Sequence, residues 1–439
     1  MLEQKTGGAV RTVYFIALAA MMYYFLTQYV YLPPLYVPFR HLFALLITAS
    51  AFVCFLIRPD LPRAVSAVKA GAVLSIPLLV MITVSLLIWS LERTDVHMIT
   101  RGLSYYLIAL NQASSAFAAV SFLYVFGERG IWYNLIAILC ANLLMIATIM
   151  LENGVGPYLA ELWTLIRTFA GENGPIIAQA EIHELAFCLG AYLVYMLTRP
   201  RRSVPFLVLL ALSIFCFLSA FKRIALAAMA AAIGVCWLLR PLERRGRGKT
   251  PLRIAHAVAL VLLAAMFAYV ALVKLGMFSW MEEAGLDTMG RADVYEAVDG
   301  LYEVSPAFLG NGMGYLTYQI GETDNFDLAV DTIHNDILQM YIDLGFWGFA
   351  VWMLSFATLR IWYFGRRGRA AEGVNAFVLV LFMLLVSTTD NTINYPLVHT
   401  TLAILIAGHG FDKRAEEERR HLEEAIARRN GTETEWDVR

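Results

Sequence analysis

A histidine and an asparagine stand where a long polar segment gives way to an apolar one. His334 and Asn335 are followed by nine residues, DILQMYIDL, and then by the tetrapeptide GFWG, which begins at Gly345. The unperturbed pKa of histidine is about 6.5, so a histidine can accept a proton at neutral pH. His334 is therefore a candidate general base that could assist a hydroxyl group in attacking an electrophilic carbon.

Two adjacent cations are candidates for binding a phosphate group. Lys222 and Arg223 separate two apolar stretches, 204–220 and 224–239, each of which as a helix only just crosses a hydrocarbon layer of about 30 Å. We expect the pair at or just below the outer membrane interface, where a charge is costly and is rarely retained without a partner. The planar guanidinium of Arg223 suits phosphate oxygens, whereas the alternative, contact with lipid headgroups, suits Lys222 better.

A third cation, Arg291, is isolated in an acidic segment. Residues 274–333 contain eleven carboxylates and two cations. Asp287 or Thr288 is placed to cap a helix that runs to about Val304, with Arg291 in its first turn. A lone arginine in such a negative field is a second candidate ligand for an anionic substrate.

Asp343 is the one carboxylate that we expect near the middle of the membrane. It lies nine residues after His334, about 13 Å along a helix. A charge at that depth is usually paired or functional, so we expect an ion pair with Lys222 or Arg223, or alternatively the capping of an internal polar pocket. The glycine-rich loop GNGMG at 310–314 lacks a preceding strand and a lysine, which favours a plain turn over a phosphate cradle.

The composition indicates what kind of chain positions these residues. Of 439 residues, 59% are hydrophobic and 16% are charged, and the mean hydropathy is +0.62. A soluble globular protein carries roughly 25% charged residues. The values exclude a soluble enzyme and a disordered scaffold, and 34 basic residues against 35 acidic ones create no net field for nucleic acid.

Long apolar runs predict an all-α polytopic membrane protein with about twelve transmembrane helices. The predicted spans lie near 12–32, 41–57, 70–90, 103–126, 131–151, 181–197, 204–220, 224–239, 254–273, 337–358, 374–388 and 397–410. The first span is too long for a signal-peptide core, and no small-residue cleavage site follows it. We therefore expect it to remain as the first membrane helix.

The distribution of basic residues predicts the orientation of these spans in the membrane. With the predicted boundaries, 26 of the 34 lysines and arginines fall on the side of both termini and 8 on the other side. The positive-inside rule then places both termini in the cytoplasm and His334 on the outer face. All five cysteines fall in predicted spans, so no disulfide is expected: Cys54, Cys140, Cys188, Cys216 and Cys236.

The predicted organisation has four parts. The first part, residues 1–273, contains nine transmembrane helices, short loops and an outer amphipathic helix near 157–169. The second, residues 274–336, is a large helical outer loop between spans nine and ten that carries candidate catalytic residues. Residues 337–410 form three further transmembrane helices, and residues 411–439 form a charged cytoplasmic tail. The amphipathic helix is predicted from helical spacing of Leu159, Leu162, Trp163, Ile166 and Phe169.

The histidine motif and three other features resemble one family. The pattern His-Asn, nine residues, Gly-x-x-Gly is similar to that of the O-antigen ligase and O-antigen polymerase superfamily of bacterial envelope glycosyltransferases. The other features are Lys222-Arg223 at a hairpin tip, GRADVYEAV from Gly290, and SPAFLGNGMGY at 305–315. The resemblance covers about residues 204–350. It implies an enzyme of the bacterial inner membrane that transfers a glycan from undecaprenyl pyrophosphate to an acceptor hydroxyl at the periplasmic face.

The resemblance also implies which residues act. In this family one loop histidine and two arginines are essential, and by motif they fall on His334, Arg223 and Arg291. We assign Lys222 to the pyrophosphate as well, and supporting roles to Asn335, Asp343 and Gly345. A departing pyrophosphate needs neutralisation of charge rather than a proton, so one base and two arginines require no metal and no cofactor. Direct attack would invert the anomeric centre.

Two acceptors are compatible with this chemistry. We favour the lipid A core oligosaccharide, as in an O-antigen ligase, and the alternative is a second lipid-linked repeat unit, as in an O-antigen or exopolysaccharide polymerase. Membrane lipids are the other expected partners, and nucleic acid is not expected. His183, Glu184 and His399, also near the outer face, lack motif support, and we expect structural roles for them.

Two other classes of protein are alternatives to an enzyme of this kind. A transporter of lipid-linked glycans is disfavoured because the spans are nearly free of charge except close to the outer face and because no internal repeat is evident. A metal-dependent oligosaccharide transferase stays open, since carboxylate spacing alone does not exclude a metal.

Overall fold

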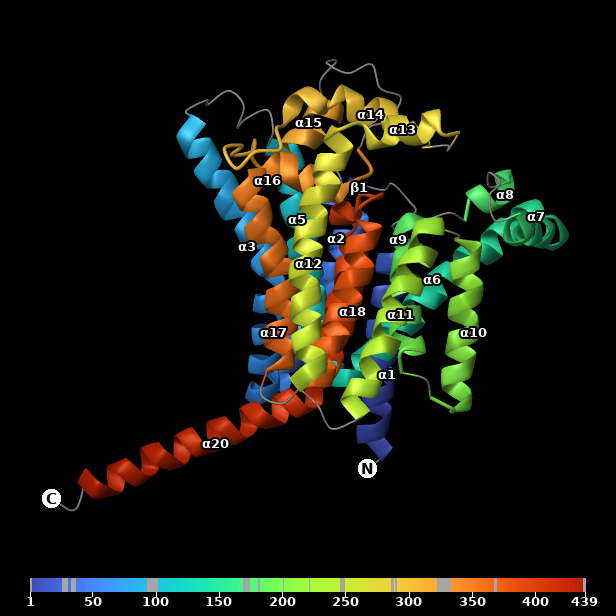
Figure 1. The fold of residues 1–439 in the computed structure, drawn as a ribbon. Coiled ribbons are helices and arrows are strands. Elements are labelled where there is room, and N and C mark those ends of the chain that lie inside the picture. The colour runs from blue at the N-terminus through green and yellow to red at the C-terminus, as the bar shows by residue number, and fades with distance from the viewer. Residues whose placement is uncertain are drawn as a thin grey trace. The chain divides into compact units, whose positions relative to one another are not determined.

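The structure is a computed structural model of the chain and is helical almost throughout (Figure 1). It describes residues 2–25, 31–32, 37–92, 102–168, 174–180, 182–199, 201–220, 222–244, 249–285, 288, 290–321, 333–366 and 369–436. Within these ranges there are two strands of two residues each, β1 (Tyr31–Leu32) and β2 (Val37–Pro38), which pair with each other in antiparallel orientation. The predicted all-α class is confirmed.

Each predicted span overlaps a helix. As far as the acidic segment, the helices are α1 (Leu2–Tyr24), α2 (Phe39–Ile57), α3 (Leu61–Glu92), α5 (Gly102–Phe126), the 3-10 helix η1 (Gly127–Arg129), α6 (Gly130–Asn153), α7 (Val155–Thr168), α8 (Pro175–Ala178), α9 (His183–Leu197), α10 (Val204–Ser219), α11 (Arg223–Arg244) and α12 (Lys249–Lys274). After α12 come α13 (Met277–Glu283), α14 (Arg291–Ala297), the 3-10 helix η2 (Asp299–Leu301), α15 (Tyr315–Gly321), α16 (Asp336–Met353), the π-helix η3 (Leu354–Leu359), α17 (Arg360–Gly365), α18 (Ala370–Val386), the 3-10 helix η4 (Thr392–Asn394), α19 (Pro396–Gly408) and α20 (Phe411–Trp436).

The long helices have the character of membrane spans. By length and composition, six helical stretches among the described residues could cross a bilayer: Arg40–Ile57, Leu61–Leu91, Ile108–Asn153, Arg223–Arg240, Lys249–Lys274 and Asp336–Gly365. Five further apolar helices are shorter. Large apolar side chains such as Phe52, Leu87 and Val261 are exposed on these helices, as expected where lipid rather than water surrounds them. The chain is a polytopic membrane protein in character, and the number of twelve crossings stays a prediction.

The chain divides into two compact units. Unit 1 comprises residues 1–73, 114–180 and 400–439, and unit 2 comprises residues 74–113 and 181–399. The helices α3, α5 and α19 each contribute to both units. All the candidate site residues of the sequence analysis belong to unit 2.

Unit 1 is built around α1, which packs on α2 and α6. Its buried centre includes Phe15 and Tyr23. The Tyr23 hydroxyl donates to Asn134 Oδ1 at 3.0 Å and lies 3.0 Å from Thr401 Oγ1. This polar contact inside an apolar core ties together three segments that are far apart in the sequence, because a buried polar group needs a hydrogen-bond partner.

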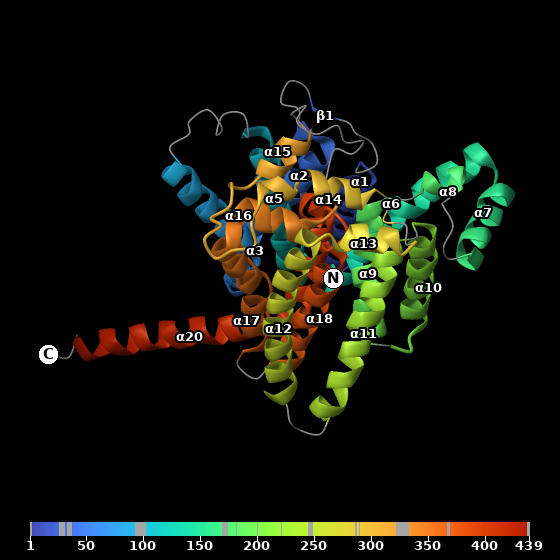
Figure 2. The same ribbon diagram turned by 45° about the horizontal axis from the view of Figure 1, so that its top comes forward.

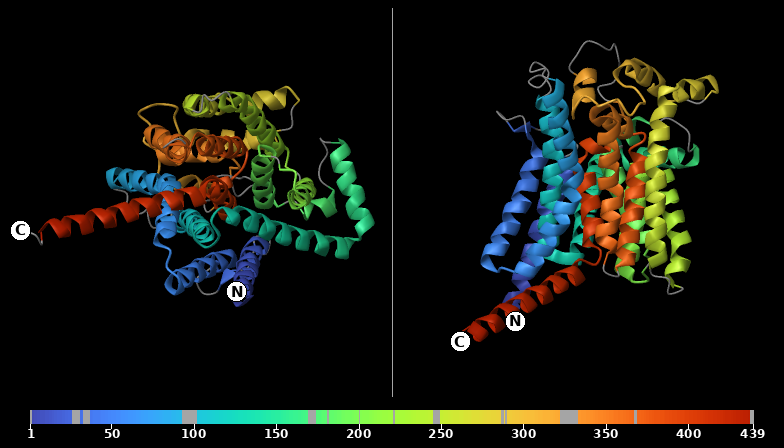
Figure 3. Two further views of the ribbon diagram at one scale, coloured as in Figure 1. Left: turned by 90° about the horizontal axis from the view of Figure 1, so that it is seen from below. Right: turned by 60° about the vertical axis from the view of Figure 1, so that its left-hand side comes forward.

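Two surface helices of unit 1 lie where the sequence predicts helices. The helix α7 buries Tyr158, Leu162 and Leu165. Of the predicted apolar face only Leu162 is buried, whereas Leu159, Trp163 and Ile166 are exposed and Phe169 lies outside the described residues. The charged tail forms α20, which runs away from the rest of the unit (Figure 3). Its first turn is anchored because Arg414 is buried and donates to the carbonyl oxygens of Ala407 and His409.

Unit 2 has α9 at its centre and short helices over one end. The helix α9 is almost completely buried and packs on α10, α11 and α18. The short helices α13, α14 and α15 lie over the ends of α12, α16 and α18 (Figures 1 and 2). The large loop predicted between the ninth and tenth spans is therefore a small helical layer beside the start of α16.

The helix predicted up to about Val304 is shorter than expected. Its N-cap is Gly290 rather than the predicted Thr288, although Thr288 Oγ1 accepts from the amide of Ala292 at 3.4 Å, and α14 ends at Ala297. The carbonyl oxygens of Asp299 and Tyr302 accept from Lys274 Nζ instead of continuing a helical ladder. Lys274, at the end of α12, thus binds the chain where a longer helix would have continued. This contact is long-range and could not be predicted from the local sequence. Asp287 lies outside the described residues.

Candidate active site

His334 occupies a constrained turn directly before α16. Its backbone φ is +49°, which makes it the one residue other than glycine with a positive φ in the described part of the chain. Asn335 begins the helix: its side-chain oxygen accepts from the amide of Leu338 at 3.0 Å. The Asn335 amide group donates to the hydroxyls of Tyr269 at 2.9 Å and Tyr295 at 3.3 Å. A left-handed conformation is costly for a residue with a side chain, so this anchored neighbour holds His334 in place.

His334 faces the turn between α18 and α19. Its Nδ1 lies 3.5 Å from Nδ2 of Asn391, at the upper limit of a hydrogen bond. Its ring centroid is 6.5 Å from that of His183, the first residue of α9. Two segments that are remote in sequence from the histidine motif therefore form part of its surroundings.

His183 belongs to a hydrogen-bonded group centred on a buried carboxylate. His183 Nδ1 lies 3.2 Å from Asp390 Oδ2, and the hydroxyl of Tyr395 donates to Asp390 Oδ1 at 2.9 Å. The amide of Asn391 donates to the same oxygen at 2.8 Å. Burial alone would raise the pKa of Asp390, but the hydrogen bonds and the charge of His183 hold it below its ordinary value. Asp390 is thus a fixed negative charge beside the two histidines.

The electrostatic surroundings of His334 favour its neutral form. Burial lowers its pKa below the ordinary value, Asp390 opposes this, and the positive charges of His183, Arg291 and Lys222 reinforce it. Because the neutral imidazole is the form that accepts a proton, His334 is available as a base at neutral pH.

Arg291 connects the outer loop to the same turn. It is the first residue of α14, as predicted for the first turn, and its Nη1 and Nη2 donate to the carbonyl oxygens of Thr288 and Thr389, both at 3.3 Å. Its Nε is buried and has no hydrogen-bond partner among the described residues. The guanidinium of Arg291, whose charge acts on His334, is a candidate ligand for a substrate oxygen.

Lys222 and Arg223 lie at the tip of a helical hairpin, as predicted. The hairpin consists of α10 and α11, with Lys222 just before α11 and Arg223 as its first residue. Lys222 is half-buried and lowers the pKa of His334, whereas Arg223 is exposed beside it. The structure therefore brings Lys222 and Arg291 into the electrostatic neighbourhood of His334, with Arg223 adjacent to the lysine.

Gly345 and the glycine-rich loop explain the second half of the histidine motif. The helix α16 is kinked at Gly345, whose φ is +69° and ψ −178°. The loop chain approaches so closely that a Cβ atom on Gly345 would lie 2.1 Å from the carbonyl carbon of Leu309. A Cβ on Gly310 would lie 2.3 Å from the Gly345 nitrogen. Only glycine at both positions lets the two backbones meet in this way.

The amides of this loop are used within the protein. The amides of Asn311 and Gly312 donate to Asp343 O at 3.1 and 2.7 Å, and that of Met313 donates to Ser85 Oγ at 2.8 Å. The carboxylate of Asp343 accepts from the amides of Gly314 at 2.9 Å and Leu316 at 3.1 Å. The loop is therefore not a phosphate cradle, in agreement with the favoured interpretation. Asp343 serves as an acceptor for buried amides, and its pairing with Lys222 or Arg223 stays a prediction.

The sequence reasoning missed part of this group. Asp390, Asn391 and Tyr395 were not singled out, and His183 was expected to be structural. Their signal was the polar run STTDNTINY at 387–395, which separates two strongly apolar spans on the predicted outer side. His399 is half-buried, its Nε2 lies 2.9 Å from Nε2 of Gln112, and its structural role stays a prediction.

The structure describes all five cysteines of the chain but not all of its candidate metal ligands. All five cysteines are free, as predicted. Among the described residues, no three His, Cys, Asp or Glu side chains are grouped so that they could hold a metal ion. The four carboxylates closest in sequence to His334 on its N-terminal side, Glu322, Asp324, Asp327 and Asp331, lie outside those residues. The metal-independent reaction stays a prediction.

Comparison with known proteins agrees with the motif. No curated protein matches the chain. A family model described as O-antigen ligase matches residues 206–353, which include Lys222, Arg223, Arg291 and His334. Residues 206–353 are thus similar to the O-antigen ligase family, in agreement with the motif resemblance.

Proposed function

We propose that the protein is an O-antigen ligase that transfers a glycan from undecaprenyl pyrophosphate to a hydroxyl of the lipid A core oligosaccharide. The observation that carries the proposal is the position of His334, a half-buried histidine within the field of Arg291, Lys222 and Asp390. A base next to cations suits a reaction in which a hydroxyl loses a proton while a pyrophosphate departs. The reaction takes place at the periplasmic face of the inner membrane, with both termini in the cytoplasm.

In this reaction one bond forms and one breaks at the anomeric carbon. The acceptor hydroxyl oxygen attacks that carbon, and its proton passes to His334. The bond from the anomeric carbon to the pyrophosphate oxygen breaks, and the electron pair leaves with undecaprenyl pyrophosphate. The guanidinium groups of Arg223 and Arg291, with the ammonium of Lys222, stabilise the charge on the departing group. A single displacement inverts the anomeric centre, and His334 then releases its proton to water.

His183 and Asp390 support the base in this proposal. Asp390 raises the pKa of His334, so it stabilises the imidazolium that forms when the acceptor proton is taken up. The hydrogen bond from Tyr395 and the contact with His183 fix this carboxylate in its position. We therefore assign Asp390 and His183 as positioning residues and His334 as the catalytic base.

The test is deletion of the gene followed by analysis of the envelope glycans. Loss of a ligase leaves full-length lipid-linked polymer in the membrane and lipid A core without O-antigen. A polymerase, in which the acceptor is a second lipid-linked repeat unit, would instead leave single repeats attached to the core, and that result would replace the ligase assignment. Unchanged glycans would contradict both.

A further inference from the structure

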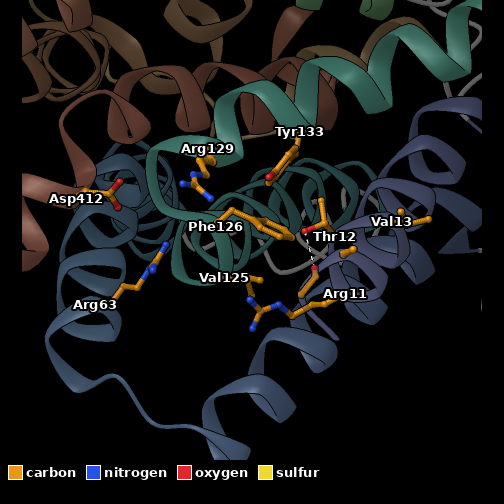
Figure 4. Close-up of a pocket in the computed structure, with 11 residues that line it drawn as sticks. Arg11, Thr12, Val13, Arg63, Val125, Phe126, Arg129, Tyr133 and Asp412 are labelled. Atoms are coloured by element: carbon orange, nitrogen blue, oxygen red, sulfur yellow. Dashed lines mark hydrogen bonds between the residues drawn. The ribbon is translucent and has the colours of Figure 1, made fainter. Parts of the chain in front are cut away.

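Three arginines converge on a cavity in unit 1, remote in sequence from the motif residues of the active site. Arg11 comes from α1, Arg63 from the first turn of α3, and Arg129 from η1 (Figure 4). Together with Tyr133 and Asp412 they line a cavity of about 730 Å³. This volume lies in the range of sites for small molecules and ligand headgroups.

The positive charge of this cavity is only partly balanced, by Asp412 near Arg63. Within the described part of the chain, no carboxylate lies within salt-bridge distance of Arg11, Arg63 or Arg129, although Asp412 lines the same cavity. Arg63 packs over the ring of Phe411 at 5.9 Å, and its Nε is buried without a hydrogen-bond partner. Guanidinium groups that face one cavity repel one another, so an anion that enters it is favoured by charge and by unused donors.

The surroundings of the cavity indicate where such an anion comes from. The cavity lies where the apolar parts of α1 and α3 begin, at Gly8 and Leu61. Next to the arginines, Val10, Val13 and Leu61 are 69%, 66% and 50% exposed. An exposed apolar rim beside a cationic cavity fits a molecule with a phosphate head and acyl chains, whereas a free inorganic anion would gain nothing from that rim.

We propose that this cavity binds the phosphate headgroup of an anionic membrane lipid. The lipid phosphate lies among Arg11, Arg63 and Arg129, and the acyl chains follow the exposed side of α1. By the distribution of basic residues, this end of unit 1 is the cytoplasmic one, so the lipid belongs to the inner leaflet. A neighbouring cavity of about 650 Å³ shares Arg11 and Arg63 and adds Arg58, which extends the cationic surface.

The experiment uses the full chain, purified in detergent and freed of bound lipid. Phosphatidylglycerol is titrated while native mass spectrometry counts bound lipids and a thermal-shift assay follows Tm, with phosphatidylcholine as the uncharged comparison. The parent protein should retain phosphatidylglycerol and gain in Tm. The double variant Arg11→Gln/Arg129→Gln should bind it at least ten-fold more weakly, and Asp412→Asn, which removes the negative charge from the cavity, should bind it more tightly.

Two controls separate the site from general charge effects. Arg202→Gln removes an exposed arginine in the loop before α10 and should bind phosphatidylglycerol like the parent. If the glutamine variant does not fold, Arg11→Lys/Arg129→Lys keeps the charge and should bind more weakly than the parent because the guanidinium contacts are lost. The proposal is overturned if the double variants bind like the parent, or if inorganic pyrophosphate alone reproduces the full thermal shift and displaces the lipid. None of these measurements depends on glycan transfer.

Discussion

The pKa of His334 reflects opposing influences from its surroundings. Burial and the neighbouring cations lower its pKa, while Asp390 raises it. A histidine whose pKa is lowered from its ordinary value is deprotonated at neutral pH, which is the form that accepts a proton from a hydroxyl group. The carboxylate on one side and the cations on the other therefore prepare one residue for proton transfer.

We expect His334→Ala to abolish transfer while the protein stays folded and inserted. Loss of a positioned base typically costs about 10² to 10⁴ in rate. The measurement is transfer by purified protein with lipid-linked donor and acceptor, with Tm as the control for folding. His421→Ala, on the exposed part of α20, is the matched variant and should transfer normally. Near-normal transfer by folded His334→Ala would exclude an essential base at this position.

Asp390→Asn should shift the pH profile of transfer. Transfer requires the neutral form of His334, so activity rises with pH through the pKa of that group. Because Asp390 raises this pKa, its neutralisation should move the rising limb to lower pH and also reduce the maximum rate. The exposed Glu296 of α14 supplies the control, and Glu296→Gln should leave the limb unmoved. A limb that stays in place, or moves to higher pH, would separate Asp390 from His334.

Arginine geometry should matter at Arg223 and Arg291. Replacement of either by lysine retains the charge but loses the planar fork that contacts two phosphate oxygens. A hydrogen bond to a charged group contributes about 1.5–3 kcal/mol, so transfer should fall roughly ten- to a hundred-fold. Kinetics with varied donor and acceptor concentrations should assign the loss to the donor. If both lysine variants turn over like the parent and like Arg202→Lys, the phosphate role is wrong.

At the scale of elements, the decisive contact is between the loop 308–316 and the kinked helix α16. Phe346 donates to the carbonyl of Phe308 at 2.9 Å, and Gly312 donates to that of Asp343 at 2.7 Å. The kink at Gly345 exposes backbone groups that a regular helix would use internally, and the loop satisfies them. The outer layer is thereby attached to the helix that begins beside His334.

The glycines at this contact should tolerate no side chain. Gly345→Ala places a Cβ in a left-handed conformation and against the loop backbone, so we expect a loss of stability of at least about 1–2 kcal/mol from the conformation alone. Gly310→Ala should behave similarly. Tm in detergent is the measurement. Gly234→Ala in α11 meets nothing within 4 Å and should be neutral or stabilising. Equal Tm values for all three variants would contradict this account of the motif glycines.

At the scale of the whole molecule, the functional prediction concerns metal ions. A divalent cation ordinarily neutralises a departing pyrophosphate, but here we assign that role to Arg223 and Arg291. Transfer should therefore persist after exhaustive chelation of the purified enzyme. If chelation stops the reaction and magnesium, manganese or calcium restores it, the arginine mechanism fails. The acidic residues Glu322, Asp324, Asp327 and Asp331 would then be the first to replace by amides.

The class of fold follows from composition and hydropathy alone, and the motif residues were predicted from their spacing. Composition and long apolar runs have only one physical solution, helices in a bilayer, because unsatisfied backbone groups are too costly there. The spacing of His334, Asn335 and Gly345 is local, so the end of a loop and the start of a helix could be read directly. The hairpin tip at Lys222 and Arg223 followed from the lengths of the two apolar stretches on either side of it.

The surroundings of His334 could not be predicted from the sequence, because they arise from long-range packing. Asp390 and His183 lie 56 and 151 residues away along the chain, and their contact arises because α9 and the turn after α18 pack beside the start of α16. The roles of Lys274 in ending α14 and of Asp343 in binding loop amides are likewise long-range hydrogen bonds. Hydropathy and spacing record which residues avoid water, but they carry no information about which helix faces which. Packing alone sets those neighbours, and with them the charges that surround His334.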